Sequence, residues 1–208
     1  MLALPRGGVP VGYEIARALG APLDVILVRK LGVPYQPELA MGAIGEGGVR
    51  ILDEAIVSAS GVSAEELGQV EVREQAELAR RAALYRGGRP RAALEGRIAL
   101  VVDDGIATGS TARAACQVAR AMGASRVVLA APVGPRSVVH DLARDADEVV
   151  LLDAPRAFVA IGRWYEDFSQ VSDEEVERLL SLAATAVAPG AAAKSGADLR
   201  TGTRNLLT

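Results

Sequence analysis

The hydrophobic positions of this chain alternate between short apolar runs and longer stretches with helical spacing. Five short and mostly apolar runs predict β-strands at residues 1–4, 24–28, 98–102, 126–131 and 148–152. Apolar residues at helical spacing separate the last three runs from one another, over residues 112–122 and 135–144. Strands that alternate with helices in this way require a parallel sheet with right-handed crossovers. We therefore predict an α/β fold with a doubly wound parallel sheet.

A long charged helix is predicted upstream of the central strand. Ser63 and Glu66 form a capping box, and the helical pattern then continues to the glycine pair at residues 87–88. The many charged side chains of this helix, Glu74 among them, predict a solvated face. Residues 86–96 are expected to form a basic linker whose charges stay in solvent.

The composition of the chain changes after a final predicted helix, which Ser172 and Glu175 are expected to cap. Residues 186–208 consist mainly of Ala, Gly, Ser and Thr with scattered charges, so they are predicted to be a disordered tail. A linker to a separate partner domain is the alternative. The folded domain is therefore predicted to span residues 1–185.

Composition restricts the classes of function that fit this chain. Half of the 208 residues are hydrophobic, which is enough for one sizeable core. The net charge of −3 gives no general electrostatic reason to bind nucleic acid or an anionic membrane. The single cysteine, Cys116, excludes an internal disulfide and is predicted to be a core residue, whereas the single histidine, His140, is expected at the surface. With no long apolar run and no basic leader, we expect a soluble cytoplasmic protein.

The stretch RIALVVDDGIATGST, residues 97–111, carries the strongest chemical signal. The buried strand at its start ends in Asp103 and Asp104, and a small-residue loop then leads into a helix. The backbone N–H groups and hydroxyls of residues 107–111 form a donor array that suits a phosphate monoester. The two carboxylates suit vicinal hydroxyls or a hydrated divalent metal, so the pattern indicates a ribose 5-phosphate. The alternative is that the acids only cap the next helix.

A second anion site is indicated near the amino terminus. Residues 5–8, Pro-Arg-Gly-Gly, follow the first predicted strand and precede a helix, so that small residues, the forked cation of Arg6 and a helix N-terminus lie together. An ordinary tight turn is the alternative. Arg29 and Lys30 follow the next predicted strand and are expected at the same sheet edge, with a solvated pair as the alternative.

The stretch from Val101 to Thr111 resembles the phosphoribosyl pyrophosphate (PRPP) signature of the type I phosphoribosyltransferases. The resemblance implies that Asp103 and Asp104 hold the ribose hydroxyls. It implies a 5-phosphate site formed by Ala107, Thr108, Gly109, Ser110 and Thr111. The Pro5 to Gly8 loop is similar to the pyrophosphate loop of the family, which assigns the leaving group to Arg6, Gly7 and Gly8, in a loop where members usually hold a strained peptide. The family also has a basic pair like Arg29 and Lys30, of which Lys30 is expected to contact pyrophosphate.

Two further segments resemble the mobile parts of these enzymes. Residues 31–60 are rich in glycine and proline, and a hairpin is predicted to turn at residues 47–48. In the family, the segment that corresponds to residues 31–60 is a mobile flap. Residues 157–171 contain most of the aromatic side chains of the chain and are similar to the hood of purine phosphoribosyltransferases. That resemblance implies that Phe158 stacks on the base and that Val159 lies beside it.

The reaction that the resemblance implies is PRPP-dependent transfer of a phosphoribosyl group to a nitrogen base with release of pyrophosphate. Catalytic roles are expected for Asp104, Arg6 and Lys30. Mg²⁺ is the expected cofactor and arrives with PRPP, while its protein ligands stay unknown. A homodimer with only small-molecule substrates as partners is expected.

Three departures from the family pattern are present, and the third is that no polar group that would recognise the base can be placed, so the base is open. Members usually have a helix before the first strand, whereas this strand starts at Met1. The 6-oxopurine enzymes have an acid where this chain has Ala107, and a lysine before the hood that is missing here. The alternative function is a non-catalytic regulator that senses PRPP or a nucleotide, and a receiver-like phosphate-binding domain is a third possibility that leaves the loop at residues 5–8 unexplained.

Overall fold

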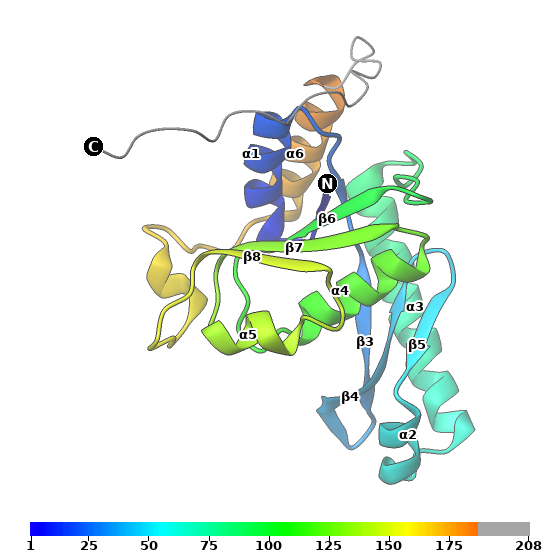
Figure 1. The fold of residues 1–208 in the computed structure, drawn as a ribbon. Coiled ribbons are helices and arrows are strands. Elements are labelled where there is room, and N and C mark those ends of the chain that lie inside the picture. Colours follow the sequence, from blue (N-terminus) through cyan, green and yellow to red (C-terminus); the bar gives the residue numbers. More distant parts are fainter. Residues whose placement is uncertain (187–208) are drawn as a thin grey trace.

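The computed structural model describes residues 1–186, which are built around a five-stranded parallel sheet (Figure 1). The strands follow the order β2-β1-β6-β7-β8, so the strand that carries the signature, β6, is central. Each neighbouring pair is parallel. The five strands are β1 (Leu2–Ala3), β2 (Asp24–Val25), β6 (Ile98–Val102), β7 (Arg126–Val133) and β8 (Glu148–Asp153).

Helices cover both faces of this sheet. Helices α1 (Gly8–Leu19) and α6 (Asp173–Ala186) pack on each other on one face, and α4 (Ser110–Ala121) and α5 (Arg136–Asp141) lie on the other (Figure 1). The side chains between α4 and the sheet form a buried apolar layer, because parallel strands with helical crossovers are covered on both sides. The prediction of a doubly wound α/β fold is confirmed.

A second, antiparallel sheet extends from the core (Figure 1). It contains β3 (Val28–Val33), β4 (Gln36–Gly45) and β5 (Val49–Leu52), and the helix α2 (Glu54–Ser60) follows it. Gly47 and Gly48 both have positive φ at the β4–β5 turn, where the sequence predicts a hairpin. The single strand predicted over residues 24–28 is wrong, because the chain leaves the core sheet after β2 and enters the second sheet at β3.

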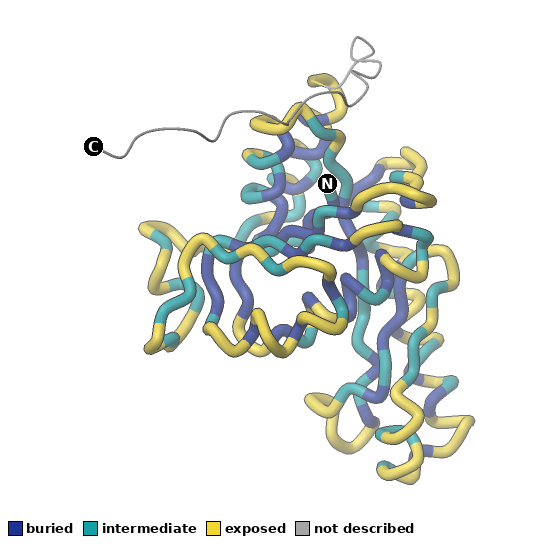
Figure 2. The backbone as a smooth tube through the Cα atoms, viewed as in Figure 1, coloured by how far each residue is buried: buried dark blue, intermediate teal, exposed yellow. Residues whose placement is uncertain are grey.

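Helix α3 (Ala64–Arg86) packs along the second sheet and begins with the predicted capping box of Ser63 and Glu66. The prediction that its charges are solvated is wrong at two positions. Glu74 is only 8% exposed because it pairs with Arg29, and Arg86 is 7% exposed because it enters an ion cluster with Asp24. Figure 2 shows the exposed backbone on the outer side of this region and the buried backbone toward the core.

The remaining sequence predictions concern single residues and the chain end. Cys116 is buried in α4, and burial raises the pKa of its thiol to about 12, as expected of a core residue. His140 lies exposed at the end of α5. Within residues 1–186, no helix combines the length and the apolar character needed to cross a lipid bilayer. The predicted tail at residues 186–208 lies outside the described residues except for Ala186, which ends α6.

Candidate functional site

The acid turn, residues 103–106, lies where the central strand β6 ends. Backbone hydrogen bonds tie it to β7, since the Asp103 N–H donates to the Ala130 carbonyl at 3.2 Å and the Ile106 N–H to the Val133 carbonyl at 2.9 Å. The Asp104 N–H donates to the Asp103 carboxylate at 2.9 Å. Both acids are therefore held at the carboxyl edge of the sheet, where open α/β sheets bind ligands.

The two carboxyl groups of the acid turn are electrostatically unsatisfied. Burial raises the pKa of Asp103 to about 7, and the neighbouring Asp104 charge adds to this rise. Burial also raises the pKa of Asp104. Neither acid has an ion-pair partner among residues 1–186. Taking a carboxylate partly out of water without a cation partner costs folding free energy, so this pair is suited to an external cation or to hydroxyl donors.

The N-terminal loop, residues 5–8, contacts the acid turn directly. It follows β1, the strand next to β6, and its Pro5–Arg6 peptide bond is cis. A Cβ on Gly7 would lie 1.8 Å from an Asp104 carboxylate oxygen, and a Cβ on Gly8 would lie 2.6 Å from the Val102 carbonyl. Only glycine allows this approach. The structure thus brings the predicted residues Arg6, Gly7 and Gly8 against the acid pair.

Arg6 faces the cavity and has one weak ion pair. Its guanidinium lies 3.9 Å from the carboxylate of Asp173, the first residue of α6. Asp173 accepts a shorter hydrogen bond, 2.7 Å, from the hydroxyl of buried Tyr85. The long Arg6 contact leaves the guanidinium able to bind an anion.

A cavity of about 670 Å³ opens between the N-terminal loop, the acid turn and the hood, residues 157–171. Arg6, Gly7 and Asp104 line one side, and hood residues 165 and 167–171 line the other. The hood lies at the end of the sheet where β8 leads into it (Figure 1). Tyr165 and Phe168 pack with ring centroids 5.1 Å apart, so the cavity combines charged groups with an aromatic wall.

The predicted phosphate loop, residues 107–111, leads from the acid turn into α4. Ala107, Thr108 and Thr111 are exposed, and Gly109 has a φ of +77° at the N-cap of α4. The hydroxyls of Thr108 and Ser110 lie 3.3 Å apart. Exposed N–H groups at the start of a 12-residue helix, next to two hydroxyls, provide the donors that a phosphate needs.

Both residues of the predicted basic pair line a cavity of about 400 Å³ beside α3, and their other contacts differ. Arg29 lies inside β3 and forms an ion pair with Glu74 of α3 at 2.7 Å, so its charge is used within the fold. Lys30 also lines a second cavity, of about 430 Å³, together with Ser110 and Arg113 of α4. Lys30 therefore lies beside the phosphate loop, not among the described residues that line the larger cavity.

Phe158 and Val159 also lie apart from the larger cavity. Phe158 is half-buried, and 67% of the Val159 side chain is exposed. The described residues that line the cavity include neither of them. Sequence reasoning instead missed Tyr165, Asp167 and Asp173, although the aromatic cluster of residues 157–171 is a signal that points to the first two.

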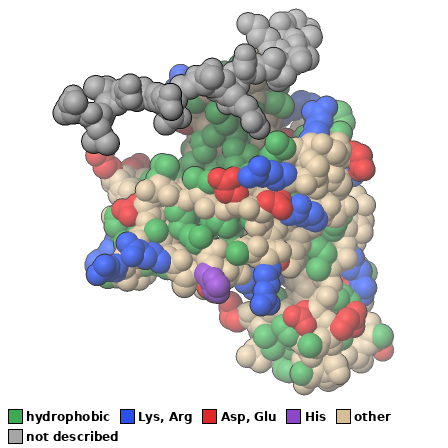
Figure 3. All heavy atoms as spheres, viewed as in Figure 1, with side chains coloured by type: hydrophobic (Ala, Val, Ile, Leu, Met, Phe, Trp, Pro, Cys, Tyr) green, Lys and Arg blue, Asp and Glu red, His purple; other side chains and the backbone are tan. Residues whose placement is uncertain are grey.

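A smaller hollow of about 490 Å³ adjoins the phosphate loop. Thr108 lines it with Arg113, His140 and Arg144, and the acids Asp141 and Asp145 balance these cations. Figure 3 shows the histidine side chain on the molecular surface with Lys and Arg side chains near it. The positive and negative charges that line this hollow nearly cancel, so the hollow is less suited to bind an anion than the phosphate loop.

A metal ion at this site has two protein carboxylates available. Across residues 1–186, no group of three or more His, Cys, Asp or Glu side chains converges to hold a metal. The oxygens of Asp103 and Asp104 are hard ligands of the kind that Mg²⁺ prefers. Two carboxylates fit a hydrated ion that a phosphorylated substrate also coordinates, because Mg²⁺ keeps several waters and is bound by few protein groups.

Comparisons with known proteins found relatives of this chain. A family model described as phosphoribosyl transferase domain matches residues 1–162. Two curated Mycobacterium tuberculosis proteins, "Putative phosphoribosyl transferase Rv0571c" and "Putative phosphoribosyl transferase MT0597", are each 54% identical over 198 residues. These matches cover 95% of this chain and 45% of each relative, so the chain spans about half the length of the curated relatives it matches.

A solved structure is similar over most of both chains. The crystal structure of the protein TT1426 from Thermus thermophilus matches with 46% identity and a TM-score of 0.79. The match covers 86% of this chain and 85% of that chain. Because the family model spans most of its residues, this chain belongs to the phosphoribosyl transferase domain family.

Proposed function

We propose that the chain transfers the phosphoribosyl group of PRPP to a nitrogen base and releases pyrophosphate, assisted by Mg²⁺. The observation that carries the proposal is the contact between the N-terminal loop and the acid turn, where only a glycine at position 7 fits against the Asp104 carboxylate and Arg6 lines the same cavity. PRPP has a diol and a pyrophosphate on neighbouring carbons. A carboxylate pair beside an arginine-bearing loop matches both groups.

The ribose half of PRPP is assigned to β6 and its loop. The carboxylates of Asp103 and Asp104 accept hydrogen bonds from the ribose hydroxyls, which removes the cost of leaving these buried acids unpaired. The 5-phosphate binds the N–H groups of residues 107–111 and the hydroxyls of Thr108 and Ser110. Fixing both ends of the ribose orients the anomeric carbon, which is the positioning part of catalysis.

The leaving group is assigned to the N-terminal loop. Arg6 and the backbone of Gly7 and Gly8 bind the pyrophosphate. Lys30 is proposed to reach it only when the second sheet moves toward the cavity, because in this structure Lys30 lies beside the phosphate loop. Mg²⁺, when bound with PRPP, neutralises charge on the departing pyrophosphate. The protein groups act in the same direction, because cations near the developing negative charge stabilise the transition state more than the ground state.

The hood protects the reacting centre. Departure of pyrophosphate leaves positive charge on the sugar, as in glycoside hydrolysis, and water would then compete with the base. The aromatic wall of the hood limits the access of water. Phe158 and Val159 are proposed to contact the base, which requires the hood to close further than it does in this structure.

A panel of nitrogen bases tests this function. The full chain is incubated with Mg²⁺, PRPP and one base at a time, and pyrophosphate release is measured. Release with one base, and none with the same base and the Asp104→Asn variant, supports phosphoribosyl transfer. Tight PRPP binding without release from any base supports the sensing regulator instead, and absence of both contradicts the proposal.

A further inference from the structure

The hood is joined to the acid turn by a hydrogen bond that the sequence does not reveal. The Tyr165 hydroxyl donates to the main-chain carbonyl of Asp104 at 2.5 Å. Its ring packs at 42° against Phe168 within the hood, so the side chain is held at both ends. The bond therefore links the aromatic wall of the cavity to the residue whose carboxylate lies against Gly7.

A second contact joins the same two segments. A Cβ on Gly105 would lie 2.5 Å from Cγ2 of Ile161, the first residue of the short 3-10 helix η1 (Ile161–Trp164). Gly105 is thus needed for the hood to pack on the acid turn. A Cβ on Gly162 would lie 2.8 Å from the Phe168 ring, so the hood is also closely packed on itself. The hood and the acid turn behave as one packed unit.

The Tyr165 hydroxyl acts on the main chain of Asp104. The accepting carbonyl belongs to the residue that carries the carboxylate, so the bond restrains the backbone from which that carboxylate projects.

We propose that Tyr165 is a positioning residue that couples the hood to the diol-binding carboxylate of Asp104. The inference rests on the proposed function, because it concerns how the ribose of PRPP is recognised. Tyr165 lines the same cavity as Arg6 and Gly7, but its hydroxyl is uncharged and already donates to the Asp104 carbonyl, so it supplies no charge to the pyrophosphate. Loss of the Tyr165 hydroxyl lowers the affinity for ligands that contain the ribose diol. It leaves the affinity for ligands that bind through pyrophosphate alone unchanged.

The experiment compares two ligands on the full-length chain. Mg²⁺ with PRPP and Mg²⁺ with inorganic pyrophosphate are titrated by calorimetry into the wild type, into Tyr165→Phe and into Tyr13→Phe. Tyr13 of α1 is the matched control, since its hydroxyl has no hydrogen bond to another described residue. We expect Tyr165→Phe to bind PRPP about five- to tenfold more weakly, the usual effect of one lost hydrogen bond, with pyrophosphate affinity unchanged.

The single tryptophan, Trp164, provides a second readout because it adjoins Tyr165 in the hood. We expect PRPP to change its fluorescence in the wild type and in Tyr13→Phe, and to change it less in Tyr165→Phe. Gly105→Ala attacks the same junction from the acid turn, since its Cβ would displace Ile161. It is expected to show the same selective loss of PRPP binding, which keeps the test open if one variant folds poorly.

The outcomes separate the inference from the proposed function. If the wild type binds no PRPP, the proposed function fails and the role of Tyr165 fails with it. If the wild type binds PRPP and Tyr165→Phe binds it equally well, only the role of Tyr165 is overturned. An equal loss of affinity for both ligands, with a melting temperature below that of Tyr13→Phe, identifies a purely structural residue and also overturns the inference.

Discussion

Acidic side chains are partly buried in two regions of this molecule, the acid turn and the base of the second sheet, and their partners differ. At the base of the second sheet, Arg86 of α3 donates to Asp24 at 2.9 Å, to the Val25 carbonyl at 2.9 Å and to Glu46. We call Arg86, Asp24 and Glu46 the arginine clamp. In the acid turn, Asp103 and Asp104 are adjacent and have no cation among the described residues.

The difference separates a structural use of charge from a ligand-binding one. The arginine clamp joins α3 to β2 and to the end of the β4–β5 hairpin, and each of its charges has an opposite partner. The acid turn retains an electrostatic cost that no residue of the described fold removes, and such a cost is typical of sites that a ligand completes. Buried charge alone therefore does not identify a site, whereas buried charge without a partner does.

The largest predicted effect comes from breaking the arginine clamp. Arg86→Met leaves Asp24 and Glu46 without a cation, and a broken buried ion pair lowers the free energy of unfolding by about 3–5 kcal/mol. Urea denaturation of the variant and the wild type measures the change. A loss below about 1 kcal/mol would mean that the clamp is solvated and that the comparison with the acid turn does not hold.

Asp103→Asn is predicted to raise the free energy of unfolding at pH 8, whereas Arg86→Met lowers it. The raised pKa of Asp103 means that the folded protein binds more protons than the unfolded chain between about pH 4 and pH 7. The free energy of unfolding of the ligand-free wild type therefore falls as the pH rises through this window, by about 2–4 kcal/mol. The variant lacks most of this dependence and is more stable than the wild type at pH 8. Denaturation at several pH values checks this, and a wild type that gains stability from pH 4 to pH 7 would contradict it.

Asp173→Asn tests an intermediate case at the N-terminal loop, where Arg6 has an acidic partner that is distant. The Asp173 carboxylate, 3.9 Å away, competes only weakly with an anion for Arg6. Removing its charge is expected to strengthen binding of Mg²⁺ with pyrophosphate about two- to fivefold, as for a partly exposed ion pair. Calorimetric titration measures the affinity. Weaker binding by the variant would show that Asp173 supports Arg6 and does not compete for it.

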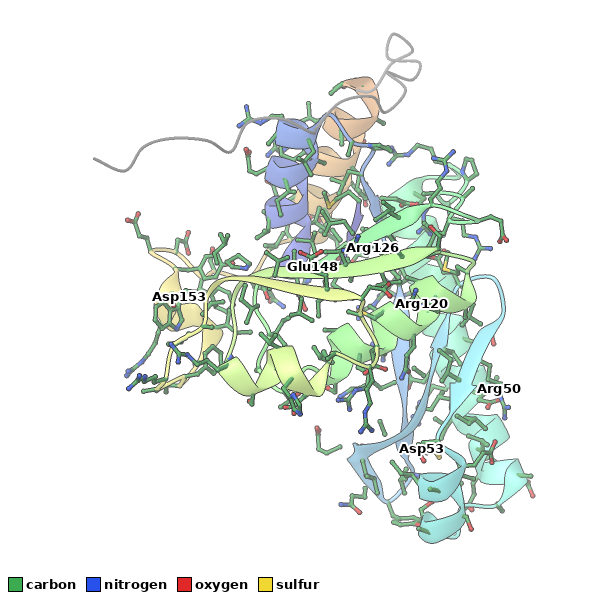
Figure 4. All side chains as sticks on the ribbon, viewed as in Figure 1. Arg50, Asp53, Arg120, Arg126, Glu148 and Asp153 are labelled. Carbon is green, nitrogen blue, oxygen red and sulfur yellow. The ribbon has the colours of Figure 1, made fainter. Side chains whose placement is uncertain are left out.

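The smallest effect is predicted for an exposed ion pair. Figure 4 labels Arg126 on β7 and Glu148 on β8, which lie toward the end of the sheet opposite Asp153 and the hood. Their 2.8 Å contact is half-exposed, so Arg126→Ala changes the free energy of unfolding by less than about 0.5 kcal/mol. Urea denaturation tests this, and a loss comparable to that of Arg86→Met would remove burial as the explanation of the difference.

The core of the fold could be predicted from the sequence because its signals are local. The apolar run at residues 98–102 is enough to predict the strand β6, and the glycines at residues 47–48 are enough to predict the hairpin turn. The signature from Val101 to Thr111 is contiguous, so the acid turn and the phosphate loop could be placed at one sheet edge from the sequence. The N-terminal loop could be assigned to the same edge only through its resemblance to the pyrophosphate loop, because periodicity does not show that β1 pairs with β6.

The errors concern residues whose partners are distant in the sequence. Glu74 has the pattern of a solvated helix residue until Arg29, 45 positions away, is known to contact it. Arg86 has the pattern of a linker residue until Asp24, 62 positions away, is known to bind it. Tyr165 is 61 positions from Asp104, and nothing in either segment indicates their hydrogen bond. Pairing across such separations depends on tertiary packing, which periodicity does not encode.

The central claim, that the acid turn and the phosphate loop bind PRPP, is tested most directly by calorimetry. PRPP with Mg²⁺ is titrated into the wild type, the double variant Asp104→Asn with Thr108→Val, and Arg126→Ala as a surface control. We expect PRPP to bind to the wild type and to the control, with no detectable binding to the double variant. Micromolar affinity retained by the double variant would contradict PRPP binding at the acid turn and the phosphate loop.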